Sequence, residues 1–174
     1  MIADEFSRPV EAMRLGGEER LYDIVATADE RLALARRFGI LSVETLSATV
    51  RLRRLGGVNL FRLSGSLVAD VLQACVVTLV PVPQHIEEEF VMTFTTDDAG
   101  DGDEVVIELN AEDPPDLIEN GVIDMGEAVA EHLALALDPF PRAPGAEFVA
   151  EEAPEEPPEP RKNPFEALAE WKKK

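Results

Sequence analysis

Few residues in this chain have the types and spacing needed for chemistry on a bound substrate. Cys75 is the only cysteine, and His85 and His132 are the only histidines. The sequence has no HExxH helix, P-loop or GxGxxG loop, and Ser64 and Ser66 lack the surroundings of a nucleophile elbow. A single cysteine excludes an internal disulfide framework and a multi-cysteine zinc site. We therefore expect no enzyme activity, no cofactor and no bound metal, with a buried, inert Cys75 and histidines on the surface or on a helix face.

An acidic stretch beginning at Asp97 comes close to the spacing of a calcium-binding EF-hand loop. Counted from Asp97, the acid at position five, the glycine at six and Glu108 at twelve fit, but Ala99 occupies position three. The flanking residues alternate as strands do, whereas an EF-hand needs flanking helices. We interpret the stretch as a solvated hairpin loop, with calcium binding as the alternative.

Four arginines lie within twelve residues and form the most distinctive charged pattern of the chain. Arg51 and Arg53 share the polar face of a predicted strand, Arg54 ends that strand and Arg62 lies on the next one. Guanidinium groups bind phosphates and carboxylates well. Two interpretations are open: a patch that binds RNA or a protein partner, or cross-strand pairs with acids of the same sheet.

Acidic residues dominate the second half of the sequence. The chain has 174 residues and a formal net charge of -19. Residues 1–80 are neutral overall, residues 81–160 hold 23 acids and only one base (Arg142), and residues 161–174 carry a net charge of +3. The central stretch would repel a phosphate backbone. Any contact with nucleic acid must therefore use the N-terminal part or the extreme C-terminus.

The elements that must position these residues can be predicted from periodicity and caps. Thr27 and Glu30 form a capping-box pattern for a helix that Gly39 can end, and Asp124 with Glu127 begins a second helix. Alternation predicts strands at 45–55, 58–63, after Gly65, at 86–94 and at 105–109. Cys75 lies in a further apolar, strand-like run at 73–81. The sequence therefore predicts an α+β fold, mainly an antiparallel β-sheet flanked by helices.

Proline content separates this domain, residues 1–140, from the C-terminal part of the chain. Residues 141–162 are acidic and proline-rich, which predicts a disordered linker. Residues 163–174 then predict a short C-terminal helix with a cap, a proline at the first helical position and an apolar stripe. The residues of this tail that we expect to bind a partner are Asn163, Pro164, Phe165, Leu168, Trp171 and Lys172. Docking of the tail onto its own domain is the alternative.

Several of these segments, taken in order, resemble the bacterial YceD family. They are the run 75–79, the strand 86–94, the sequences GVIDMGE at 121–127 and LALAL at 133–137, and the ending NPFEALAEWK. The resemblance covers residues 43–139 and the tail, with Trp171 where leucine is common. Some family members carry a second cysteine shortly after the first, whereas Val76, Val77 and Thr78 follow Cys75 here. This chain therefore could not support a family-wide zinc role.

The resemblance implies a non-enzymatic factor for the accumulation or processing of large-subunit (23S) ribosomal RNA. The acidic body favours an adaptor for a basic ribosomal protein or an rRNA-processing factor, and a direct rRNA-binding protein using the four arginines and the terminal lysines is the alternative. A magnesium-dependent phosphodiesterase built from clustered acids is a third, weaker interpretation.

The N-terminus and the hydropathy pattern favour a soluble cytoplasmic protein. The first residues are acidic where a signal peptide needs bases, and they lack an apolar core. The nearly apolar run at 74–83 is too short to span a bilayer.

Overall fold

The computed structural model describes residues 5–55, 60–96 and 114–147 of the chain. It confirms the α+β class. The elements in order are the strand β1 (Pro9–Glu11), a 3-10 helix (Ala12–Arg14), β2 (Arg20–Val25), α1 (Ala28–Phe38), β3 (Ser42–Arg54), β4 (Leu60–Ala74), β5 (Pro81–Thr95), β6 (Asp116–Leu117), a second 3-10 turn (Glu119–Gly121), β7 (Val122–Asp124) and α2 (Met125–Ala136). The predicted strand at 105–109, the acidic loop at 97–108 and the tail at 163–174 lie outside the described residues.

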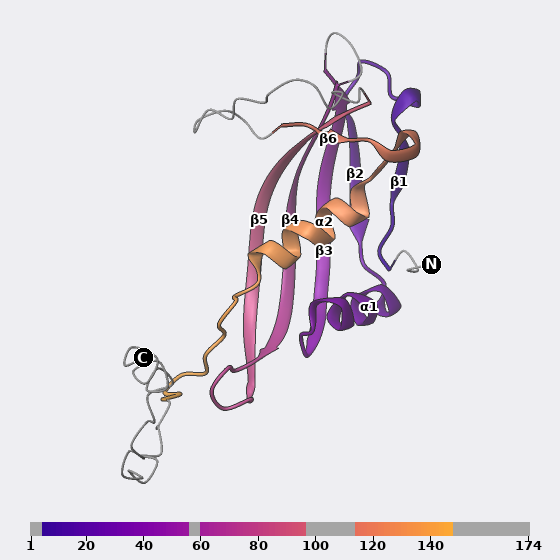
Figure 1. Ribbon diagram of the computed structural model, residues 1–174. Coiled ribbons are helices and arrows are strands. Elements are labelled where there is room, and N and C mark those ends of the chain that lie inside the picture. The colour runs from indigo at the N-terminus through magenta and orange to yellow at the C-terminus, as the bar shows by residue number, and fades with distance from the viewer. Residues whose placement is uncertain (1–4, 56–59, 97–113, 148–174) are drawn as a thin grey trace, which may run out of the picture.

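Among the described residues, a five-stranded sheet in the order β2-β3-β4-β5-β6 forms the body of the fold. The pairs from β2 to β5 are antiparallel, and β6 joins β5 in parallel. β1 and β7 form a separate antiparallel pair. Figure 1 shows α2 lying across one face of the sheet and α1 beside one end of it. No helix within the described ranges is long and apolar enough to cross a membrane.

The hydrophobic core lies between the sheet and the helices. The predicted apolar face of β3 is buried: Leu46, Ala48, Val50 and Leu52 are at most 6% exposed. Val129 and Leu133 of α2 are fully buried in the same cluster. We call this the inner face of the sheet. The opposite, outer face carries the alternate residues of β3, namely Ser47, Thr49, Arg51 and Arg53, which are exposed or half-buried.

The predicted break in the sheet at Gly65 is wrong, because β4 runs without interruption through that residue. Gly65 pairs with Val50 on one side and with Phe90 on the other. A Cβ at residue 65 would lie 2.8 Å from Cζ of Phe90 and 3.1 Å from the carbonyl oxygen of Thr49. The glycine therefore makes room for an aromatic ring within the sheet and does not form a turn.

The strand-like run at 73–81 does not form one strand either. β4 ends at Ala74 and β5 begins at Pro81, so the residues between them form the hairpin connection. The N–H of Cys75 donates to the carbonyl of Val80 at 2.8 Å, and Leu79 adopts a left-handed conformation with φ 61°. Apolar composition suggested a strand, but the backbone turns here.

The first helix begins and ends where the sequence predicts. Thr27 accepts a hydrogen bond from the N–H of Glu30, the Glu30 carboxylate accepts one from the N–H of Thr27, and Gly39 ends α1 with φ 67°. Leu34 of this helix is buried in the core, whereas Leu32 is 52% exposed. The Glu30 carboxylate also accepts from both terminal nitrogens of Arg8, at 2.7 and 3.0 Å.

The second helix begins at the predicted cap, but its Glu127 does not complete a capping box. The Asp124 carboxylate accepts hydrogen bonds from the N–H groups of Gly126 and Glu127. The Glu127 carboxylate turns instead to the guanidinium of Arg37, with one contact at 2.8 Å. This ion pair joins the last turn of α1 to the first turn of α2.

The ion pair between Glu30 and Arg8 should make stability depend on pH. The hydrogen bond from Arg8, followed by those from the Thr27 backbone and side chain, lowers the pKa of Glu30 to about 2. The folded state therefore gains stability above pH 4.5, the ordinary pKa of the group, and loses it as the pH falls through about 2. We expect Glu30→Gln to lower the free energy of unfolding by about 1–2 kcal/mol at pH 7, since partial exposure screens the pair. Urea unfolding of both proteins from pH 7 to pH 3 should show this difference shrinking below pH 4.5. Glu18→Gln, at an exposed position, is the control, and an equal effect there would contradict the prediction.

Candidate interaction surfaces

The outer face of the sheet brings together three of the four predicted arginines. Arg53 of β3 stands directly opposite Arg62 of β4, and Arg51 precedes Arg53 by two residues on the same face. We call Arg51, Arg53 and Arg62 the arginine cluster. Arg54 lies on the other face, where its guanidinium sits over the ring of Phe61, 5.7 Å from the centroid. The cluster is a cationic surface that could bind phosphates or carboxylates.

The residues directly opposite these arginines on the neighbouring strands are not acids. Arg51 faces Leu21 of β2 and Ser64 of β4, and Arg62 faces Thr93 of β5. No acid therefore stands directly opposite Arg51 or Arg62 in the register of the sheet, and the choice between a binding patch and cross-strand pairs with acids stays a prediction. Like charges face each other at the Arg53–Arg62 pair, an arrangement that costs stability.

Other arginines of the N-terminal half are held in ion pairs within the domain. Arg8 binds Glu30, and Arg37 binds Glu127 and approaches Glu5 at 3.9 Å. The hydrogen bond with Glu30 raises the pKa of Arg8, and the hydrogen bond with Glu127 raises the pKa of Arg37. Both groups stay charged at any physiological pH, so they serve to join the N-terminal segment and the helices.

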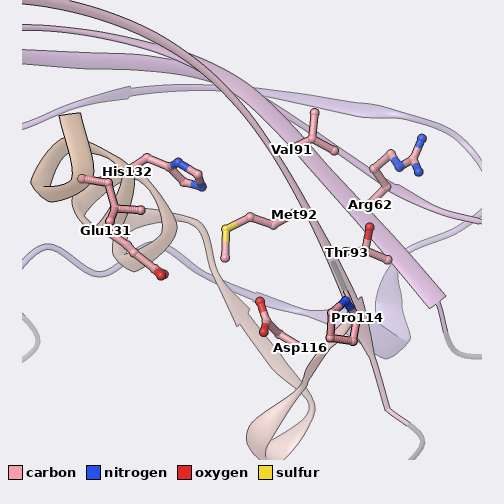
Figure 2. A pocket seen from close by; sticks show the side chains of 9 residues that line it. Arg62, Val91, Met92, Thr93, Pro114, Asp116, Glu131 and His132 are labelled. Atoms are coloured by element: carbon pink, nitrogen blue, oxygen red, sulfur yellow. The ribbon is translucent and has the colours of Figure 1, made fainter. Parts of the chain in front are cut away.

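Exposed acidic side chains gather along β5. Glu87, Glu88 and Glu89 are consecutive and all exposed. Asp116 of β6 and Glu131 of α2 border a groove of about 740 Å³ beside the same strand. Its lining residues are Arg62, Val91, Met92, Thr93, Pro114, Asp116, Glu131, His132 and Leu135. Figure 2 shows Met92, His132 and Glu131 on one side of β5, with Arg62 and Val91 on the other. We call this the β5 groove.

Both histidines take part in contacts within the domain. His85 is an exposed residue of β5 whose Nδ1 lies 2.7 Å from the Asp70 carboxylate and whose Nε2 lies 3.4 Å from that of Glu87. The hydrogen bond with Asp70, and then that with Glu87, raises the pKa of His85. His132 lies on α2 and stacks on Phe90, with ring centroids 4.4 Å apart. In the described part of the chain, no three or more His, Cys, Asp or Glu side chains are arranged to hold a metal ion.

Cys75 is buried as predicted, but its sulfur accepts hydrogen bonds that favour the negatively charged thiolate. Its Sγ accepts hydrogen bonds from the N–H groups of Val77, Thr78 and Ala143 at 3.3–3.4 Å. The Ala143 N–H, followed by the Thr78 side chain and the Thr78 and Val77 backbone, lowers the pKa of Cys75 to about 6. The sequence offered no basic neighbour that would lower this pKa. The backbone donors come from the turn and from a distant segment, so spacing could not reveal them.

Residues beyond α2 pack against the turn between β4 and β5. The Val76 N–H donates to the Pro141 carbonyl. The Gln84 side chain of β5 donates to the Ala136 carbonyl and accepts from the Asp138 N–H. The chain is thus attached to the domain past the predicted boundary at residue 140. The predicted tail residues Asn163, Pro164, Phe165, Leu168, Trp171 and Lys172 lie outside the described residues, so their role stays a prediction.

Sequence reasoning missed the β5 groove. It predicted the strand at 86–94 but not that the strand lies at the border of the antiparallel sheet. Pro81 and Pro83 were the available signal, since prolines within a sheet occur on edge strands.

One comparison with known proteins gives a match. A family model described as "Large ribosomal RNA subunit accumulation protein YceD" matches residues 63–172, which is more than half of the chain. The matched region begins within β4, later than residue 43, and includes the segment of the predicted tail. No curated protein and no solved structure matches.

Proposed function

Because the chain belongs to the YceD family of large ribosomal RNA subunit accumulation proteins, we propose that it acts as a non-enzymatic adaptor in ribosome biogenesis. In this role it binds a basic ribosomal protein or a basic rRNA-processing factor in the cytoplasm and thereby supports the accumulation of 23S rRNA. The family match carries the biological process, and the charge distribution supports the choice of partner.

The observation that carries the adaptor role is the row of exposed acids along β5, although Arg62 of the arginine cluster also borders the β5 groove. Three successive glutamates of β5 are exposed beside a groove bordered by Asp116 and Glu131. An acidic surface attracts basic proteins and repels the phosphate backbone of RNA. Ribosomal assembly brings many basic chains together with RNA, and an acidic partner can shield them until they dock.

Capture of the intact protein from its native cell tests this role. We expect a basic large-subunit protein or processing factor to remain bound after ribonuclease treatment, because the contact is between proteins. Depletion of the chain should lower 23S rRNA relative to the small-subunit RNA. If every captured protein disappears with the RNA, the adaptor role is wrong.

Direct RNA binding through the arginine cluster is the second candidate, favoured by the exposed outer-face position of Arg51 and Arg53. The logarithm of the RNA-binding constant falls linearly with the logarithm of the salt concentration, and each phosphate contact that is lost makes this line shallower by about 0.7–0.9. We expect the adaptor to bind a 23S rRNA fragment only weakly at about 150 mM salt, with Arg51→Ala/Arg53→Ala equal to wild type. Arg14→Ala is the control, since Arg14 is exposed and pairs with Glu11. A salt dependence that becomes shallower by more than one in the double variant, but not in Arg14→Ala, would favour direct RNA binding.

A phosphodiesterase activity is the remaining class. We expect precursor rRNA incubated with the full chain and magnesium to keep its length. Specific cleavage that needs both the protein and the metal would contradict the non-enzymatic role.

A further inference from the structure

One border of β5 is open along most of its length in the described part of the molecule. On one side, β5 pairs with β4 continuously, from Pro81 opposite Ala74 to Thr95 opposite Leu60. On the other side, within the described residues, β6 pairs only with Phe94 and Thr95. Within the described residues, the strand therefore has no paired neighbour on this side before Phe94.

The direction of the backbone groups along this border can be read from two hydrogen bonds. The Ile118 N–H donates to the Thr95 carbonyl at 2.7 Å, so Thr95 points its backbone groups away from β4. The Cys75 N–H donates to the Val80 carbonyl, so residue 80 points toward β4. Backbone groups alternate along a strand. The odd-numbered residues from 85 to 93 therefore present their N–H and C=O groups to the open border.

Proline protects only the first part of this border. Pro81 and Pro83 belong to the same odd-numbered series, and neither has an N–H to present. Prolines at such positions discourage pairing of an edge strand with another chain. From His85 onward this protection is absent and five consecutive outward positions keep both groups. That stretch runs beside the β5 groove, which has Val91 and Thr93 in its lining.

Charge and apolar contacts along the border define what could pair with it. Glu87 and Glu89 pair with Val68 and Ser66 of the outer face, so their carboxylates lie on that face. On the α2 side, the groove offers Met92 and the 73% exposed Leu135, with Glu131 close by. A strand added here would meet Glu87 and Glu89 on the outer face. On the inner face it would meet the apolar Met92 and Leu135 together with the acids Glu88 and Glu131.

A second copy of this chain does not suit the border. Pairing two β5 strands would bring the glutamates of one copy beside those of the other, and like charges in this position repel. The same glutamates favour a segment of positive charge.

We propose that an extended segment of a basic protein adds to the border of β5 as a further strand, between residues 85 and 93. Its lysines or arginines alternate with apolar residues: the cations lie over Glu87 and Glu89, and the apolar residues enter the β5 groove over Met92 and Leu135. Main-chain hydrogen bonds provide the attachment and the alternate side chains provide the selectivity. This inference rests on the proposed adaptor role and names the surface that performs it.

Hydrogen exchange measured by NMR on the full chain tests the proposal directly. The probe is a nine-residue peptide of alternating lysine and valine, and the control peptide alternates glutamate and valine. With the lysine peptide, the amides of Glu87, Glu89 and Val91 should exchange at least tenfold more slowly. The amides of Glu88 and Phe90 should be slow in both states, because they already bond β4. Strong protection of the odd-numbered amides in the free chain would overturn the proposal, as would binding of the peptide without added protection.

Two pairs of variants separate strand addition from simple charge attraction. Val91→Pro removes an outward N–H without touching the β4 ladder, and it should abolish peptide binding, whereas Val91→Ala should bind as wild type does. Glu87→Lys/Glu89→Lys should weaken binding at least tenfold, while Glu18→Lys/Glu19→Lys, of equal charge and far from β5, should change it less than threefold. Circular dichroism establishes that each variant is folded. Equal binding by Val91→Pro and Val91→Ala, or by the two charge variants, would overturn the proposal.

Capture from cells distinguishes this inference from the adaptor role itself. If Glu87→Lys/Glu89→Lys retains the basic partner that wild type captures, the β5 border is not the surface and the adaptor role stands. If wild type captures no basic protein yet binds the lysine peptide along β5, the surface is confirmed and the adaptor role is wrong.

Discussion

Gly126→Ala is expected to lower the free energy of unfolding by about 3 kcal/mol, although alanine is normally favoured over glycine within a helix by about 1 kcal/mol. A Cβ at residue 126 would lie 2.9 Å from the carbonyl carbon of Phe6, closer still to its oxygen, and 3.0 Å from the nitrogen of Arg8. These are backbone atoms, so no side-chain rotation can relieve the clash. The N-terminal segment would have to leave the first turn of α2.

Two other glycines provide controls for this effect. Nothing lies within 4 Å of a Cβ added to Gly17, so Gly17→Ala should change stability by less than about 0.5 kcal/mol. The loss of stability for Gly65→Ala should lie between those of Gly17→Ala and Gly126→Ala, because the nearest atom belongs to the ring of Phe90, which can shift. Urea unfolding followed by circular dichroism measures all three. A Gly126→Ala protein as stable as wild type would show that the N-terminal segment does not pack there.

The second large effect is expected for Asp124→Ala, at about 2–4 kcal/mol. One carboxylate oxygen accepts from the N–H groups of Arg8 at 2.7 Å, Gly126 at 2.9 Å and Glu127 at 3.2 Å, and the other accepts from the Ser7 hydroxyl. The substitution therefore removes a helix cap and leaves donors of the N-terminal segment without their acceptor.

Asp124→Asn separates the cap from the charge. Asparagine keeps an oxygen for the three N–H groups and is itself a good N-cap, so it should cost about 1 kcal/mol. Thermal unfolding should place its midpoint several degrees above that of Asp124→Ala. Equal losses in the two variants would mean that the negative charge, and not the hydrogen bonds, stabilises this junction.

Residues with strong local signals could be predicted from the sequence. Thr27, Glu30 and Gly39 define α1 through contacts within the helix and its caps, and the alternation around Val50 fixes the buried face of β3. The predicted end of a strand at Gly65 was wrong, because glycine is typical of turns, whereas here it accommodates Phe90 from another strand. Such a reason is visible only when the strands are paired.

The candidate site was predictable only in part, and for a similar reason. Arg51 and Arg53 share a face by simple alternation, but the position of Arg62 opposite Arg53 depends on the register of the hairpin. β1 and β2 were missed altogether: β1 has only three residues, and β2 carries apolar residues on both faces, since Leu21 and Val25 are exposed while Ile24 is buried. The open border of β5 depends on strand order, which no local pattern contains.

The pairing of β1 with β7 has a consequence for the order of events during protein synthesis. Arg8 reaches its acceptor Asp124 across 116 residues, whereas β3, β4 and β5 are joined by hairpins and can pair as soon as they leave the ribosome. Translation adds roughly 5–20 residues per second, so the N-terminal segment waits on the order of ten seconds for its partner to be made. During that time the emerging chain has its central sheet but lacks α2, and the apolar inner face is uncovered. We expect the nascent protein to need protection by a chaperone until residues 122–136 have emerged.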